Sequence, residues 1–112
     1  PSMAEDVLPE VIEETDTVKI ELLPGKFEDK GMEVRRINMA KGSELVISGS
    51  KSDHLMAVVN DTGNAVLVCN DKEYSINKAD PGKSLLMIPD SIKDFKIQAS
   101  ENTQIIDTFT PV

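Results

Sequence analysis

The residues from 44 to 109 constrain the fold most, because they form short apolar runs separated by turn-forming residues. Each run is five to seven residues long and is bounded by turn sequences such as Ser-Gly-Ser, Asp-Thr-Gly-Asn or Asp-Pro-Gly. Short strands about 8 to 12 residues apart, each followed by turn residues, are typical of an all-β sandwich or barrel. The runs are 44–48, 55–60, 65–69, 73–77, 84–88, 95–99 and 103–109.

Two more strands precede these runs. Residues 18–22 and 32–37 alternate apolar and charged side chains, as half-buried strands do. No window of the sequence carries a sustained apolar stripe at helical spacing. The sequence therefore predicts a small all-β barrel of about nine strands over residues 17–112, and nine strands suffice to close a barrel or a two-sheet roll.

The first 16 residues differ from the rest of the chain, because they hold six acidic side chains and no Lys or Arg. Pro9 also interrupts any helix there, so residues 1–16 are predicted to be an acidic flexible arm or linker. An alternative is that its apolar residues Val7, Leu8, Val11 and Ile12 dock on a partner or on a sheet edge. Pro1-Ser2 before Met3 has the look of a cleaved tag.

Charge and composition exclude several function classes. A net charge of −8 argues against nucleic acid, since phosphate binding needs clustered Lys and Arg. No apolar run approaches the roughly 18 residues of a membrane span. The single cysteine, Cys69, excludes an intrachain disulfide and predicts a reducing, intracellular location. Cys69 itself is interpreted as a small buried hydrophobe. Ser, His and Asp are all present, but no nucleophile-elbow motif or Cys–His pairing marks a reactive group.

Three segments together resemble the cupin family. They are 55–69, an apolar strand and a Gly turn followed by a second strand; 73–76; and 80–89, which runs from a glycine to Ile-Pro. Gly63 and Gly82 stand where the glycines of the two cupin motifs stand, and Pro89 stands at the strand-ending proline. A glycine suits a hairpin end and a proline suits a strand terminus, so elementary backbone chemistry agrees with the resemblance. The resemblance to cupins implies a cupin-like jelly-roll fold.

The same resemblance locates the positions that hold a metal in enzymatic cupins. The two histidines of the first motif fall near Ser48 and Ser50, the third ligand falls on Asp53 or His54, and the histidine of the second motif falls near Asp94. Only one imidazole remains among them, and serine hydroxyls are poor ligands at neutral pH. These five residues are therefore predicted to form a vestigial pocket with no metal, no cofactor and no catalytic residue.

A cupin without ligands suggests an interaction module rather than an enzyme. Residues 53–60 followed by Gly63, together with Phe95-Lys-Ile97, resemble the C-terminal dimerisation domain family of centromere protein C. This resemblance implies a homodimerising, protein-binding module of a centromere or kinetochore scaffold in the nucleus. Pro89-Asp-Ser departs from that family's usual Pro-x-Gly-Asn. The alternative is a small bacterial-type cupin that binds or isomerises a sugar-acid-like molecule, with or without metal. Residues 106–111 resemble the strand ending that is common in such cupins.

Two of the predicted strands, 65–68 and 85–88, are apolar at consecutive positions. They therefore present apolar side chains on both faces of their sheet. Because a barrel has one interior, a second copy of the chain is the expected cover for the outer face. Another protein on the barrel surface or on the arm is a further expected partner, whereas nucleic acid and membrane are not. The candidate contact residues are Leu85, Leu86, Met87, Ala65, Val66, Leu67 and Val68.

Overall fold

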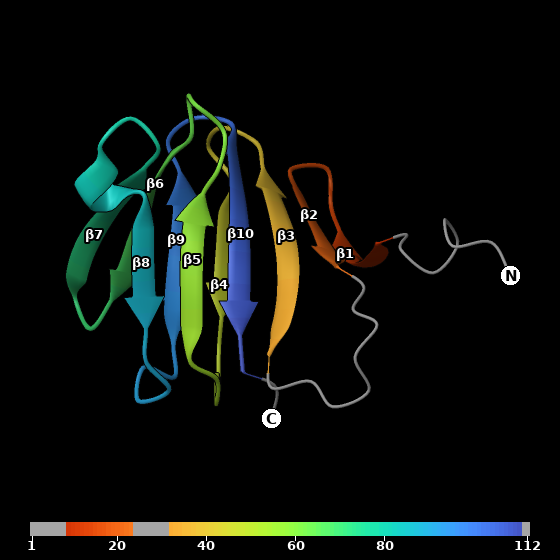
Figure 1. Ribbon diagram of the computed structural model, residues 1–112, viewed down its shortest axis with the longest axis vertical. Helices are drawn as coiled ribbons and strands as arrows, with labels where there is room; N and C mark the ends of the chain where they lie inside the picture. Colours follow the sequence, from red (N-terminus) through yellow and green to blue (C-terminus); the bar gives the residue numbers. More distant parts are fainter. Residues whose placement is uncertain (1–8, 24–31, 111–112) are drawn as a thin grey trace, which may run out of the picture.

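The computed structural model describes residues 9–23 and 32–110, which form ten strands and one short 3-10 helix (Figure 1). The predicted all-β class is confirmed, and the nine expected strands are all present with ends within two residues of the prediction. The elements are β1 (Glu10–Glu14), β2 (Val18–Leu22), β3 (Glu33–Met39), β4 (Glu44–Ile47), β5 (His54–Val58), β6 (Asn64–Cys69), β7 (Lys72–Asn77), η2 (Pro81–Lys83), β8 (Leu85–Ile88), β9 (Phe95–Ala99) and β10 (Thr103–Phe109).

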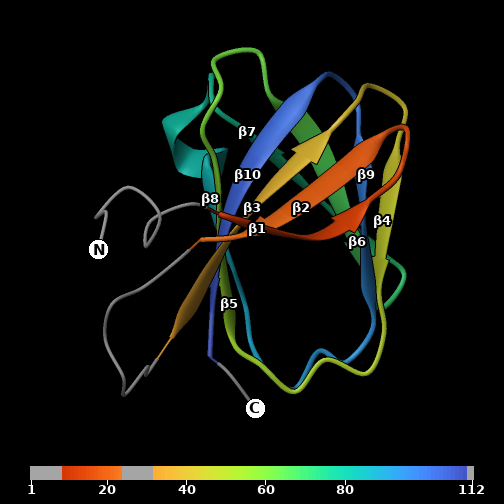
Figure 2. The same ribbon diagram turned by 90° about the vertical axis from the view of Figure 1, so that its right-hand side faces the viewer.

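The strands form two antiparallel sheets that face each other as a jelly-roll sandwich (Figure 2). One sheet has the order β1-β2-β3-β10-β5-β8, and the other has the order β4-β9-β6-β7. Along most of the strands the buried side chains alternate with more exposed ones, as in β9, where Phe95, Ile97 and Ala99 are buried. The core between the sheets is built of aliphatic side chains such as Ile37 and Ile105, both fully buried.

The last strand, β10, lies in the middle of the larger sheet. It pairs with β3 on one side and with β5 on the other, so that Asp107 lies opposite Arg35 and Met56 while Phe109 lies opposite His54. Because side chains directly opposite each other share a face, Arg35, His54 and Asp107 all point into the sandwich at the same end. This register creates the polar cluster described below.

β6 and β7 are joined by a tight two-residue turn. Asn70 and Asp71 have φ of 49° and 61°, which is the left-handed conformation that two-residue hairpins need and that Asn and Asp tolerate. The turn fixes the register, so that Tyr74 lies opposite Leu67 and faces the interior side of the smaller sheet. β7 and β8 are the edge strands on the same side of the sandwich (Figure 1).

The predicted domain boundary at residue 17 needs a correction. Residues 10–14, assigned to the flexible arm, form β1 and pair with β2 through backbone hydrogen bonds, with an irregularity between Val11 and Glu13. All five side chains of β1 are exposed, so the strand is held by its backbone rather than by the burial that sequence patterns reveal. Residues 1–8, which include the presumed tag remnant and part of the arm, lie outside the described residues.

Candidate functional site

A buried polar cluster lies between the sheets, at the end where the loops 48–53 and 89–94 connect the strands. His54 is the first residue of β5 and is 4% exposed, and Asp107 of β10 is completely buried. Both positions belong to the inward-facing set of their strands, whose other members are apolar except for Thr103. A buried carboxylate is tolerated only where it is paired and hydrogen-bonded, so the cluster must supply partners.

Asp107 is the centre of this cluster. The Arg35 Nε atom donates to Asp107 Oδ2 at 2.9 Å, and His54 Nδ1 lies 3.0 Å from Oδ1 and 3.1 Å from Oδ2. On the far side of the imidazole, Ser50 Oγ lies 3.1 Å from His54 Nε2. Arg35, Asp107, His54 and Ser50 thus form one continuous hydrogen-bonded chain that runs from the sheet interior to the loop 48–53.

The partners of His54 determine its tautomer. An ionised carboxylate can only accept hydrogen bonds, so His54 Nδ1 carries the proton and donates to Asp107. When the ring is neutral, Nε2 is the acceptor and the Ser50 hydroxyl donates to it. Two aromatic rings fix the imidazole plane, because Phe109 stacks on it at 5.7 Å and Phe95 meets it edge-on at 5.6 Å. Among the described residues, every buried side-chain nitrogen and oxygen has a hydrogen-bond partner.

The structure brings together only two of the five residues predicted for the vestigial pocket, Ser50 and His54. The other three lie on the surface: Asp53 Oδ1 accepts from the backbone N–H of Asp90, Asp94 Oδ1 accepts from that of Gly49, and Ser48 is exposed. The two aspartates are thus used to tie the loops 48–53 and 89–94 together. The prediction of one pocket containing all five residues is wrong in this respect, because Asx-type loop contacts compete for those carboxylates.

The donors present do not fit the metal site of enzymatic cupins. Both nitrogens of His54 are engaged, by Ser50 and by Asp107. Within residues 9–23 and 32–110, no three His, Cys, Asp or Glu side chains gather closely enough to hold a metal ion.

Arg35 and Asp107 are the functional candidates that sequence reasoning missed. The signal was the alternation itself, because Thr103, Ile105, Asp107 and Phe109 form the inward-facing set of the last strand. A charged residue in an inward-facing set demands a partner of opposite charge. Arg35 occupies the equivalent place in β3, two residues before the buried Ile37.

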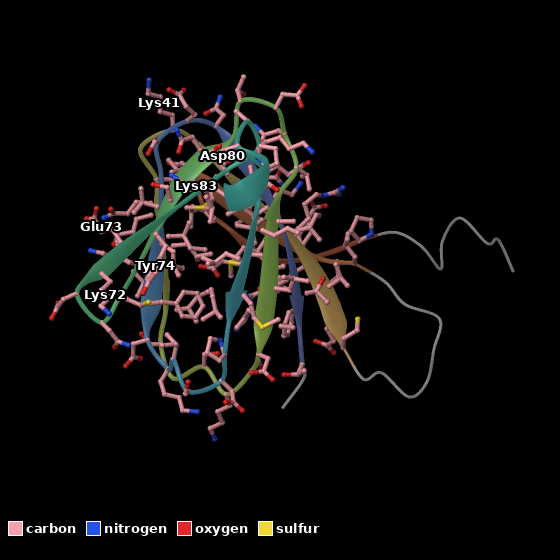
Figure 3. All side chains as sticks on the ribbon, turned by 60° about the vertical axis from the view of Figure 1, so that its left-hand side comes forward. Lys41, Lys72, Glu73, Tyr74, Asp80 and Lys83 are labelled. Atoms are coloured by element: carbon pink, nitrogen blue, oxygen red, sulfur yellow. The ribbon has the colours of Figure 1, made fainter. Side chains whose placement is uncertain are left out.

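A separate pocket of about 200 Å³ opens between the sheets on the side where β7 and β8 are the free edges. Its walls are almost entirely apolar, with Cys69 and Tyr74 as the residues that carry a thiol and a hydroxyl. Tyr74, 42% exposed, follows Lys72 and Glu73 on β7, and those two residues lie at the outer margin of the molecule (Figure 3). The lining residues are Leu67, Cys69, Tyr74, Leu86, Met87, Ile88, Pro89 and Ile92.

The seven residues predicted as dimer or partner contacts divide between the two faces of their strands. Leu85 and Met87 of β8 are 60% and 71% exposed, and Leu55 of β5, opposite Met87, is 42% exposed. Ala65 and Leu67 are buried in the core and therefore cannot contact a partner. Leu86 is half-buried towards the pocket, and Val66 and Val68 are half-buried in β6. The exposed apolar surface thus belongs to β8 and β5 rather than to β6.

A larger, polar groove of about 490 Å³ lies at the opposite end of the six-stranded sheet, along the β1–β2 turn. Its side-chain amides bond mostly to backbone groups, as where Asn60 Oδ1 accepts from the backbone N–H of Gln104 at 2.8 Å, and Gln104 Nε2 donates to Asn38 Oδ1 at 2.9 Å. Beside the groove, Arg36 donates two hydrogen bonds to Glu21, at 3.1 and 3.3 Å. These bonds and the positive charge of Arg36 lower the pKa of Glu21 below its ordinary value. We interpret this network as structural.

Solved structures of known proteins share this fold. An RmlC-like cupin from Shewanella frigidimarina is 18% identical, with a TM-score of 0.69 over 99% of this chain and 89% of that one. An ectoine synthase from P. lautus is 14% identical, with a TM-score of 0.71 over 99% of this chain and 76% of that one. KdgF from a Halomonas species is 10% identical, with a TM-score of 0.64 over 98% and 91%. The chain therefore has a cupin-like fold, as predicted.

These identities are low enough that the likeness concerns the fold alone. No protein-family model matches the sequence, and a search of well-characterised proteins finds no match. The resemblance to centromere protein C, with its nuclear location, stays a prediction. In the described part of the chain, no helix is long and apolar enough to cross a membrane.

Proposed function

We propose that this chain is a small-molecule-binding module with a cupin-like fold, and that it takes an apolar ligand between the free edges of β7 and β8. The observation that carries the proposal is the pocket between the sheets, whose walls are Leu, Ile, Met and Pro side chains. Concave, mostly apolar cavities with one or two polar groups are the usual form of small-molecule sites.

The size and lining of the pocket define the ligand class. A volume of about 200 Å³ is below the roughly 300 to 1,000 Å³ of sites for drug-sized molecules, so the ligand is a fragment-sized molecule. A sugar acid fits poorly, because its hydroxyls and carboxylate would lose water without gaining partners from Leu86, Ile88 or Ile92. A short aliphatic alcohol or a similar molecule fits better, with its polar end towards Tyr74 at the mouth.

The cupin-like fold supports this proposal over a centromere scaffold. One of the similar solved structures is named an ectoine synthase, so in that protein the fold serves small-molecule chemistry. For this chain we propose binding at the pocket and assign no reaction to it.

Tyr74 makes a direct test possible, because the chain has one tyrosine and no tryptophan. Titration with n-hexanol should change the tyrosine fluorescence in a saturable way, and the methyl NMR signals of Leu67, Leu86 and Ile88 should shift. Leu86→Phe fills the pocket and should weaken binding by about tenfold or more, which corresponds to about 1.4 kcal/mol.

The matched control for this titration is Ile47→Phe. Ile47, like Leu86, is a partly buried aliphatic residue packed on the core, but it does not line the pocket. Ile47→Phe should therefore bind n-hexanol as the parent does. A fluorescence change that never saturates, or one that is equal in the Leu86→Phe variant, would refute a ligand site at this pocket.

Self-association is a second candidate function, favoured by the exposed apolar surface of β8. Leu85 and Met87 point away from the core on an edge strand whose outer backbone groups have no strand partner among the described residues. A second copy pairing edge to edge, antiparallel and two-fold symmetric, would cover both the edge and these side chains.

A pair of charge substitutions tests self-association. Leu85→Glu should give a monomer if β8 forms the contact, whereas Val46→Glu should leave the molar mass unchanged. Val46 is a fair control, because it is 62% exposed against 60% for Leu85 and lies on β4 in the other sheet. Light scattering after size exclusion measures the mass. A monomeric parent, or a dimer that survives Leu85→Glu, would eliminate this interface.

A further inference from the structure

We propose that Ser50 is an activated nucleophile, and that Ser50, His54 and Asp107 form an acyl-transfer triad acting on small esters. This site is independent of the apolar pocket, since none of the three residues lines it. The loop 48–53 has no nucleophile-elbow sequence, so only the folded structure reveals the arrangement.

The geometry of the three side chains has the order that nucleophilic catalysis requires. Ser50 Oγ lies 3.1 Å from His54 Nε2, and His54 Nδ1 lies 3.0 Å from Asp107 Oδ1. Because Asp107 holds the proton on Nδ1, the free lone pair of Nε2 faces the serine hydroxyl. This is the relation of nucleophile, base and orienting carboxylate that defines the Ser-His-Asp triad on unrelated folds.

The site is held rigidly on its inner side, and Ser50 at its outer side is half-buried. His54 is 4% exposed and Asp107 is fully buried, with Phe95 and Phe109 against the imidazole. Ser50 is half-buried in a connecting loop, between the exposed residues Gly49 and Lys51. The backbone N–H of Ser50 donates to the Lys93 carbonyl at 2.8 Å, which fixes the serine against the neighbouring loop. A reactive oxygen held in one place and reachable from solvent is the arrangement that acyl transfer needs.

The proposed reaction balances with water as the only co-reactant. Ser50 Oγ attacks the ester carbonyl carbon while its proton moves to His54 Nε2. The tetrahedral oxyanion collapses, the bond from carbonyl carbon to leaving oxygen breaks, and the Nε2 proton passes to the leaving alcohol. Water then adds to the acyl-serine and gives its proton to Nε2. Collapse releases the carboxylic acid, and Ser50 Oγ recovers its proton.

Two features predict slow turnover and a small substrate. Arg35 already pairs with Asp107, so the imidazolium formed during the reaction gains less from that carboxylate than it would beside a free one. The backbone N–H of Ser52 donates a hydrogen bond to Ser50 Oγ at 3.4 Å, which engages a lone pair of the attacking oxygen in the resting state. Small esters with good leaving groups, such as p-nitrophenyl acetate, are the expected substrate class.

Labelling with a fluorophosphonate tests the proposal without depending on turnover. The folded protein should be modified at Ser50, located by peptide mass spectrometry, and heat-unfolded protein should not. Ser48→Ala should label as the parent does, because Ser48 is an exposed serine in the same loop with no hydrogen bond to His54. Ser50→Ala and His54→Ala should abolish labelling. No label on folded protein, or a label on Ser50 that survives His54→Ala, would overturn the triad.

A second pair of variants keeps the test decisive if His54→Ala fails to fold. Ser50→Cys places a thiol next to the Nε2 lone pair, and Ser48→Cys places one in the same loop without a base. Alkylation by iodoacetamide should be at least about tenfold faster for Ser50→Cys, because proton transfer to His54 raises the thiolate fraction. Equal rates for the two variants would show that His54 does not activate position 50.

Discussion

Removing the Arg35 side chain should destabilise the protein far more than removing that of its neighbour Arg36. The two arginines follow each other in β3 and point to opposite faces of the sheet. Arg35 points inward and pairs with Asp107, whose side chain is 0% exposed, whereas Arg36 points to the opposite face and pairs with Glu21, whose side chain is 10% exposed; the Arg36 side chain itself is 35% exposed against 17% for Arg35. Arg35→Gln leaves the Asp107 carboxylate with His54 as its remaining side-chain partner.

The size of the effect follows from the burial of the pair. Breaking a buried ion pair by removing one partner costs about 3–5 kcal/mol, because the other charge stays buried and uncompensated. The Arg35 side chain is 17% exposed and His54 still donates to Asp107, so we expect a cost at or below the lower end of this range, about 2–3 kcal/mol. For a domain of this length, this loss lowers the melting temperature by roughly 8–12 °C.

Urea unfolding of Arg35→Gln and Arg36→Gln, followed by circular dichroism, measures both effects. The double variant Arg35→Gln with Asp107→Asn should lose less stability than the sum of its single variants, because the uncompensated charge is gone. Sums that agree within about 0.5 kcal/mol would show that the two side chains do not interact. Equal destabilisation by Arg35→Gln and Arg36→Gln would refute the argument from burial.

Two further predictions concern other parts of the larger sheet and its turns. Arg36 holds the pKa of Glu21 below the 4.5 of an unperturbed glutamate, so this pair stabilises the fold above that pH and the contribution is lost as the pH falls through the folded-state value. Unfolding free energies measured in acid should therefore decline more steeply for the parent than for Arg36→Gln, and parallel curves would contradict the pairing. Gly63→Ala should cost about 1–3 kcal/mol, because its new methyl group would overlap Asn60 Oδ1 and Val58 Cγ1. At Gly82 the atom nearest to an added Cβ lies 3.5 Å from it, so Gly82→Ala should change the free energy of unfolding by no more than about 0.5 kcal/mol in the same urea assay. Similar costs at both positions would rule out the steric argument.

The strands could be predicted from the sequence because burial of one face of a sheet requires apolar and polar residues to alternate along each strand. β9 shows it clearly, with Phe95, Ile97 and Ala99 buried and the residues between them half-buried. β1 escaped prediction because none of its side chains is buried. Its apolar Val11 and Ile12 are adjacent and both 47% exposed, and it pairs through backbone groups, which every residue except proline offers equally.

The candidate site was only half predictable, for a different reason. His54 and Ser50 are four residues apart, and the family resemblance placed both in one pocket. Arg35 and Asp107 are 72 residues apart, and their contact depends on the register between the third and the tenth strand. A single sequence does not determine which strands are neighbours in a sheet, so the residue that orients the histidine remained unrecognised.

The central place of β10 has a consequence for synthesis on the ribosome. β3 and β5 both need residues 103–109 as their hydrogen-bonding partner, and these residues are translated after every other described strand. Until they emerge, β3 and β5 each have one edge with unpaired backbone N–H and C=O groups and with apolar side chains at alternate positions. Such an edge can pair with another chain and so promotes aggregation. The larger sheet therefore cannot be completed until residues 103–109 have left the exit tunnel.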